Sequence, residues 1–147
     1  MSLACMAPAP HPVILYVEDE ILIQAMVLAA FEHTRFAIVT AISAAQAMEM
    51  LADPASGIDG LITDINLNSR LNGWDVARAG RASNSTLPVI YVSGASGLEW
   101  TVQGVSGSEM IIKPFAASFL VEAMDSRFPT DGECKVEILW ESTEICN

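Results

Sequence analysis

Positively charged residues are scarce in this sequence, and their scarcity argues against one large class of function. Seven Lys and Arg residues stand against eighteen Asp and Glu residues, which gives a formal net charge of −11. Proteins that bind nucleic acids need clustered cations to displace the counterions of phosphates, whereas the cations here are scattered along the chain. We therefore expect no direct binding of DNA or RNA.

Paired cysteines and long hydrophobic runs are also missing. Cys5, Cys134 and Cys146 lie near the two ends without a C-x-x-C pair, which indicates reduced thiols in a cytoplasmic protein. The longest apolar run, residues 21–31, is about half of the ~18 residues that a membrane helix needs, and Gln24 interrupts it. The N-terminus lacks the basic region of a signal peptide. We expect a cytoplasmic protein that does not enter a membrane.

The sequence does contain a regular alternation of two kinds of segment. Short apolar runs typical of buried strands are each followed by a longer segment with helical character. The expected strands are 13–17, 36–40, 60–63, 89–93 and 109–113, and the expected helices are 21–33, 43–53, 73–83, 97–105 and 116–128. Continuous rather than alternating apolar strands indicate burial on both faces. The pattern predicts an α/β fold, a doubly wound five-stranded parallel sheet with helices on both faces.

Side chains within the expected helices suggest how these helices begin and pack. Ser43 and Asn72 stand where two helices start, and their side chains suit the N-cap position. Methionine is an adaptable apolar residue, so the methionines of the helical segments are expected to fill the core. They are Met26, Met48, Met50 and Met124.

Polar side chains stand where the expected strands end. Glu18 and Asp19 follow the first strand, and Asp64 follows the third. Ser93 ends the fourth strand and Lys113 ends the fifth. Because ligands of open α/β sheets bind beyond the carboxyl ends of the strands, we expect these side chains to surround one site. Three carboxylates and one ammonium leave a charge of about −2, which favours a divalent cation, and oxygen ligands favour Mg²⁺.

A carboxylate beside Mg²⁺, with a hydroxyl and an ammonium nearby, can accept a phosphoryl group. That reaction depends on positioning and on neutralising the charge of the transferred oxygens. Aspartate is a nucleophile for this chemistry and forms an acyl phosphate. Asp64 is the best candidate, because it comes singly from an expected central strand, whereas Glu18 and Asp19 form a pair suited to the metal.

Four stretches, VILYVEDE, LITDIN, VIYVSG and IIKPF, occur in an order that resembles the receiver domain of two-component response regulators. The resemblance covers about residues 12–128 and implies the CheY-like strand order 2-1-3-4-5. It implies a signalling domain and not a classical enzyme. This domain would accept a phosphoryl group from a sensor histidine kinase or a histidine phosphotransfer protein. The phosphorylated domain would then switch its binding to a downstream protein.

The same resemblance assigns the site residues. It implies Asp64 as the phospho-acceptor, with the hydroxyl of Ser93 and the ammonium of Lys113 as its catalytic partners. A cis peptide bond is implied between Lys113 and Pro114. The implied Mg²⁺ ligands are Glu18, Asp19, Asp64 and the backbone carbonyl of Asn66.

Two positions depart from the usual pattern of this family. In the loop INLNSRLNG, Leu67-Asn68 replaces the usual Met-Pro and one extra residue precedes the glycine, so the loop should be longer and less stiff. Met110 stands where the family carries a Tyr or Phe that couples the site to a distant surface. A flexible thioether should bias the two states of such a switch less sharply.

The resemblance leaves segments at both ends. We expect a leader over residues 1–11, the receiver domain over 12–128 and a tail of unknown role over 129–147, with no output domain. In the tail, Val136, Ile138 and Trp140 alternate with other residues, so it could add an edge strand, lie on a partner or be loose. The chain is thus expected to be a stand-alone receiver.

The first expected helix carries no charge from residue 21 to residue 31, although a surface helix normally needs a polar face. We expect the face around Ala25 and Leu28 to dock a phosphotransfer partner or a second copy of the chain. The sequence leaves open whether the chain dimerises through the helices around Phe115, Phe119 and Leu120.

Two other functions compete with phosphoryl acceptance. The chain could be an interaction or scaffold domain that binds its partners whatever its phosphorylation state. It could also be a phosphohydrolase with an aspartate nucleophile, but such enzymes commonly carry a second aspartate two residues later as the general acid. That position is Asn66, whose amide cannot donate a proton in this role.

Overall fold

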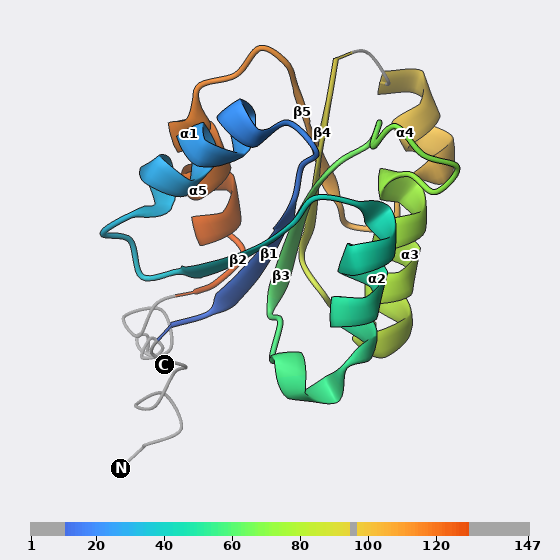
Figure 1. The fold of residues 1–147 in the computed structure, drawn as a ribbon, viewed down its shortest axis with the longest axis horizontal. Helices are drawn as coiled ribbons and strands as arrows, with labels where there is room; N and C mark the ends of the chain where they lie inside the picture. The colour runs from blue at the N-terminus through green and yellow to red at the C-terminus, as the bar shows by residue number, and fades with distance from the viewer. Residues whose placement is uncertain (1–10, 95–96, 130–147) are drawn as a thin grey trace, which may run out of the picture.

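A parallel sheet between two layers of helices forms the body of the protein in a computed structural model that describes residues 11–94 and 97–129 (Figure 1). The strands pair in the order β2-β1-β3-β4-β5, and every pairing is parallel. They are β1 (Val13–Val17), β2 (Ala37–Ala41), β3 (Gly60–Asp64), β4 (Val89–Ser93) and β5 (Glu109–Ile112). The predicted doubly wound sheet and its strand order are both confirmed.

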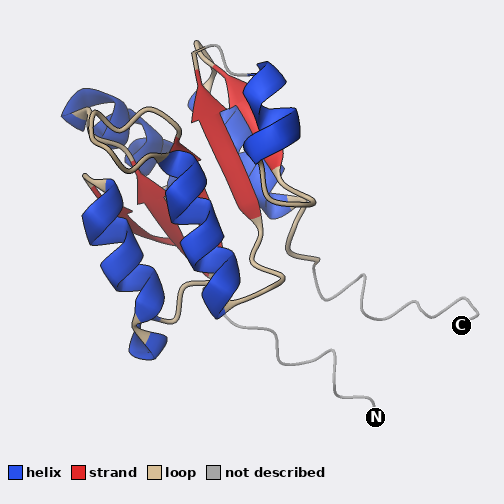
Figure 2. Ribbon diagram, turned by 90° about the vertical axis from the view of Figure 1, so that its right-hand side faces the viewer, coloured by secondary structure: helices blue, strands red, loops and turns tan. Residues whose placement is uncertain are grey.

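Helices cover both faces of the sheet, as Figures 1 and 2 show. The helices are α1 (Ile21–Phe31), α2 (Ala44–Ala52), α3 (Gly73–Ser83), α4 (Gly97–Gln103) and α5 (Ala117–Asp125), with a short 3-10 turn, η2 (Pro54–Ser56). α1 lies beside α5 on one face, and α2 lies beside α3 on the other. Among the described residues, no helix is both long enough and apolar enough to cross a bilayer.

The core consists of two hydrophobic clusters separated by the sheet. In β1, Leu15 and Val17 face the cluster under α2 and α3, while Ile14 and Tyr16 face the cluster under α1 and α5. All four side chains are fully buried. Because successive residues of a strand point to opposite faces, burial on both faces explains why the strand is apolar throughout.

Local signals fix several element ends. The Ser43 hydroxyl accepts the backbone N–H of Gln46, and Asn72 forms a capping box with Asp75, so both predicted N-caps are confirmed. The η2 turn was not predicted; it begins with the Asp53 side chain accepting the Ala55 N–H.

Compared with the expected ranges, β2 begins and ends one residue later, β3 extends by one residue to include Asp64, and β5 and several helices are shorter. α1 ends at Phe31, two residues early, and His33 beyond it takes a left-handed conformation with φ of 65°. α4 ends at Gln103, followed by Gly104. β5 ends at Ile112, so Lys113 is the first residue beyond the strand.

Candidate functional site

Three carboxylates converge at the carboxyl edge of the sheet. Glu18 and Asp19 follow β1, and Asp64 is the last residue of the neighbouring strand β3. One carboxylate oxygen of each residue lies within 4.8 Å of those of the other two. Glu18 is fully buried, Asp64 is 5% exposed and Asp19 is half-buried. The predicted acidic cluster therefore exists, and solvent reaches it on the Asp19 side.

Glu18 is held by donors from its own strand and the following turn. The Tyr16 hydroxyl donates to Oε1 of Glu18 at 3.1 Å, and the Glu20 backbone N–H donates to Oε2 at 3.3 Å. The pKa of Glu18 is raised to about 7, first by burial of the carboxyl group and then by the negative charge of Asp64. A bound cation would favour the ionised form of this carboxyl.

The side chain of Lys113 provides the positive charge of the site. Its ammonium lies 2.9 Å from Oδ2 of Asp64. Desolvation lowers the pKa of Lys113, but the hydrogen bond and charge of Asp64 outweigh it, so the net pKa is raised. The backbone N–H of Lys113 donates to the Ser93 carbonyl at 2.8 Å, and the Lys113–Pro114 peptide bond is cis, as the resemblance implied.

Ser93 and Asn66 lie at the same edge. Ser93 ends β4 and is 6% exposed, one residue beyond Val92, which pairs with Asp64 in the register of β3 and β4. The backbone N–H of Asn66 donates to Oδ1 of Asp64 at 3.2 Å. All six residues that the sequence singled out are thus gathered at one edge of the sheet.

The first turn of α3 packs directly on the end of β3. A side chain on Gly73 would overlap the carbonyl oxygen of Asp64 and the Cα of Ile65. The Gly73 N–H donates to the Ile65 carbonyl at 2.8 Å. The glycine is required here because the helix approaches the strand end closely, and this contact fixes the backbone that carries Asp64.

Two residues around the site escaped the sequence analysis. Tyr16 could have been found, because it stands two residues before Glu18 and therefore shares its side of β1. Asn68 donates from Nδ2 to Oδ2 of Asp19 at 2.7 Å. The sequence marked Asn68 only as part of the Leu67-Asn68 departure from the family pattern and gave it no contact, since the contact depends on the path of the loop between β3 and α3.

An apolar hollow of about 380 Å³ adjoins the site. It is lined by Ile23, Met26, Lys113, Pro114 and Phe115, so it shares Lys113 with the acidic cluster. Met26 is 49% exposed, which makes its predicted role in the core wrong. The helix α1 is apolar on all sides, but only one side packs on the sheet, so Met26 on another side stays exposed to solvent.

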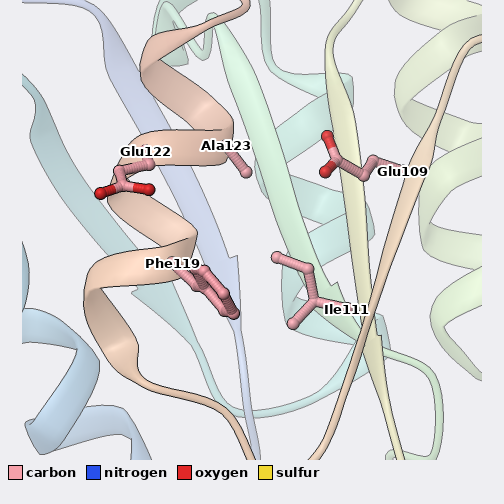
Figure 3. A pocket seen from close by; sticks show the side chains of 5 residues that line it. All are labelled: Glu109, Ile111, Phe119, Glu122 and Ala123. Carbon is pink, nitrogen blue, oxygen red and sulfur yellow. The ribbon is translucent and has the colours of Figure 1, made fainter.

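A second hollow of about 300 Å³ lies between β5 and α5, where Figure 3 shows Ile111 and Phe119 pointing toward one another. Its other lining residues are Glu109, Glu122 and Ala123, none of which belongs to the acidic cluster. Phe119 is 58% exposed, whereas Leu120 is fully buried. Leu120 is therefore not available for the dimer contact that the sequence left open around these residues.

A model of the response regulator receiver domain matches residues 14–125 of the chain. A response regulator receiver protein from Sinorhizobium medicae WSM419 is 33% identical, with a TM-score of 0.76, over 81% of this chain and 95% of that one. The comparison with curated proteins gives no match.

More distant solved structures share the fold. A response regulator receiver domain protein from Clostridium thermocellum is 25% identical, with a TM-score of 0.69, over 78% of this chain and 92% of that one. The receiver domain of a sensor histidine kinase from Pseudomonas aeruginosa PAO1, described with a magnesium ion in its active site cleft, is 20% identical. Its TM-score is 0.66, over 79% of this chain and 96% of that one.

Proposed function

Because the chain belongs to the response regulator receiver domain family, we propose that Asp64 accepts a phosphoryl group during two-component signalling. The observation that carries this proposal is the environment of the Asp64 carboxylate. One oxygen binds the ammonium of Lys113 at 2.9 Å, and the carboxylates of Glu18 and Asp19 stand close by. Such a cluster combines a nucleophile with groups that can neutralise a transferred phosphoryl group.

The proposed reaction transfers one phosphoryl group to one carboxylate oxygen. An oxygen of ionised Asp64 attacks the phosphorus of a phosphohistidine donor, forming a P–O bond while the P–N bond breaks. The electron pair returns to the imidazole nitrogen, which takes a proton from solvent. Lys113 stabilises the transferred oxygens by charge, and the Ser93 hydroxyl donates a hydrogen bond to them.

The residues present fit Mg²⁺. Three carboxylates offer hard oxygen ligands near one point, and Lys113 leaves them with a charge of about −2. We assign Glu18, Asp19, Asp64 and the backbone carbonyl of Asn66 as its ligands, and the magnesium described in the related Pseudomonas aeruginosa domain supports this choice. When bound, Mg²⁺ would neutralise negative charge on the transferred phosphoryl oxygens.

The exposed side of α1 is the proposed docking surface for the phosphoryl donor, a sensor histidine kinase or a histidine phosphotransfer protein. Leu22 is 85% exposed and Ile21 is 63% exposed, and the hollow beside Met26 leads to Lys113. An apolar surface next to the acceptor suits a partner that must bring its histidine to Asp64. Leu22 is the most exposed large apolar residue of this surface, and of the two residues that the sequence favoured, Ala25 is exposed and Leu28 is partly exposed.

Phosphorylation by a small donor tests the proposal without a partner. The full chain and Asp64→Asn are incubated with acetyl phosphate and Mg²⁺, and the intact masses are measured. We expect one phosphoryl adduct, labile to hydroxylamine, on the wild type only. Absence of the adduct would favour the phosphorylation-independent scaffold, and rapid phosphate release from free metabolites would favour a phosphohydrolase.

A further inference from the structure

Each carboxylate of the acidic cluster has a donor of its own among the described residues. The Tyr16 hydroxyl and the Glu20 N–H donate hydrogen bonds to Glu18, and the Lys113 ammonium donates one to Asp64. The donor for Asp19 is the side-chain amide of Asn68, whose Nδ2 lies 2.7 Å from Oδ2. A carboxylate has only acceptors, so the NH₂ group, and not the amide oxygen, must face Asp19.

The loop reaches Asp19 through two successive side-chain turns. Asp64 Oδ1 accepts the backbone N–H of Asn66 at 3.2 Å, and Asn66 Oδ1 accepts the backbone N–H of Asn68 at 3.4 Å. Each bond spans two residues, as in an Asx turn. The loop thereby bends from the phospho-acceptor back over the cluster and ends with its amide on Asp19.

The backbone of Asn68 also suits this task. Its φ is 55°, a left-handed conformation that asparagine tolerates better than most side chains. Glycine adopts the same conformation freely but has no amide. Replacing Asn68 with glycine would therefore keep the left-handed backbone conformation and remove the hydrogen bond to Asp19.

We propose that Asn68 is a positioning residue of the metal site, which holds one oxygen of Asp19 so that the other is oriented toward Mg²⁺. This inference rests on the proposed function, because it concerns the same cation. Asp19 is the most exposed of the three acids and the one without a cationic or hydroxyl partner among residues 11–94 and 97–129, so its orientation depends on this amide. Donors that orient metal ligands commonly change metal affinity 10–100-fold.

The test compares Asn68→Gly with Ser69→Gly in the full chain. Both variants introduce a glycine into the same exposed loop, but only the first removes the amide, because Ser69 donates to the Leu71 carbonyl and not to the acids. Mg²⁺ binding is measured by isothermal titration calorimetry at the same pH for the wild type and both variants. We expect Asn68→Gly to weaken Mg²⁺ binding about tenfold and Ser69→Gly to change it less than about twofold.

Other outcomes overturn the inference. Equal weakening in both variants would mean that loop stiffness matters and the amide does not, and an unchanged dissociation constant in Asn68→Gly would remove Asn68 from the site. Circular dichroism and the melting temperature without Mg²⁺ check that each variant is folded.

Phosphorylation by acetyl phosphate at increasing Mg²⁺ concentrations gives a second measurement. Asn68→Gly should need more Mg²⁺ for its half-maximal rate and should reach the wild-type rate at saturation. A rate that stays low at saturation would assign Asn68 to the phosphoryl transfer itself and overturn a positioning role. A wild type that binds Mg²⁺ in an Asn68-dependent manner but is never phosphorylated would overturn the proposed function alone, whereas a wild type that binds no Mg²⁺ would overturn both.

Discussion

The ammonium of Lys113 lies 2.9 Å from Oδ2 of Asp64, although the two residues are 49 positions apart in the sequence. The pairing depends on β4, whose last residue, Ser93, accepts the backbone N–H of Lys113. Side chains from β3 and from the end of β5 therefore meet across the intervening strand. The contact holds one oxygen of Asp64 before any donor arrives.

Removal of this ammonium should slow phosphoryl acceptance. Lys113→Met leaves three acids without their cation, and the loss of one charged donor at a reacting centre typically costs about 10²-fold in rate. The rate is measured by intact mass with acetyl phosphate. Arg78→Met is the matched control, since it removes one positive charge from an exposed pair with Asp75. An equal rate for Lys113→Met and the wild type would contradict the role given to Lys113.

Glu18→Gln should change the pH dependence of stability in metal-free protein. The pKa of Glu18 is raised from 4.5 to about 7, chiefly by burial and then by Asp64. Because the folded pKa exceeds the unfolded one, ionisation of Glu18 destabilises the fold. This cost is absent below about pH 4.5 and complete above about pH 7.

Glutamine cannot ionise, so it removes the cost. Relative to the wild type, Glu18→Gln should therefore stabilise the protein more at about pH 8 than at about pH 5. Urea unfolding in a chelator measures the difference. A gain that does not vary with pH would show that Glu18 titrates normally. Added Mg²⁺ should raise the free energy of unfolding of the wild type more than that of the variant, because the ion binds the carboxylates of the folded state.

Leu22→Glu tests the docking surface on α1. Leu22 is 85% exposed, so a charge there should leave the fold intact while disfavouring an apolar partner. We expect transfer from a phosphorylated histidine phosphotransfer protein to fall at least about tenfold, with no change in the reaction with acetyl phosphate. Val102→Glu on α4 is the control, because Val102 is 81% exposed on another helix. Equal losses in both variants would argue against α1 as the specific surface.

Gly73→Ala tests the contact between α3 and the end of β3. The added methyl group would overlap the backbone of Asp64 and Ile65, and overpacking of this kind costs about 1–3 kcal/mol. We expect this loss in the free energy of unfolding, together with slower phosphorylation, because the backbone of Asp64 must shift. Gly94→Ala adds a methyl group with no neighbour within 4 Å in the described part of the chain and should not destabilise the fold. Comparable stability of the two variants would refute the close approach.

The sequence predicted the sheet because its strands are apolar throughout and its polar residues follow them. Glu18, Asp64 and Lys113 were found because a parallel sheet brings all strand ends to one edge. The exposed face of α1, Ala25 included, was expected from its lack of charge, but the high exposure of Leu22 was not. Which side of an evenly apolar helix meets the sheet depends on tertiary packing, and no periodicity marks it.

The contact of Asn68 with Asp19 was beyond sequence reasoning for another reason. It depends on the left-handed backbone of one loop residue and on two weak side-chain turns, and such geometry leaves little trace in composition. The expected leader and the expected tail both lie almost wholly outside the described residues. Their roles remain predictions.

The arrangement around Arg35 bears on how the protein can be joined to others. His11 contacts the Arg35 carbonyl, and the Arg35 guanidinium binds Asp125 and the Phe128 carbonyl, so the first and last parts of the described body meet there. Arg35 precedes β2 and lies at the amino edge of the sheet, opposite Asp64. Reporter proteins joined directly at residues 11 and 129 would therefore attach at the edge of the sheet opposite the acceptor, and a circular permutation that links these two residues would need only a short connector.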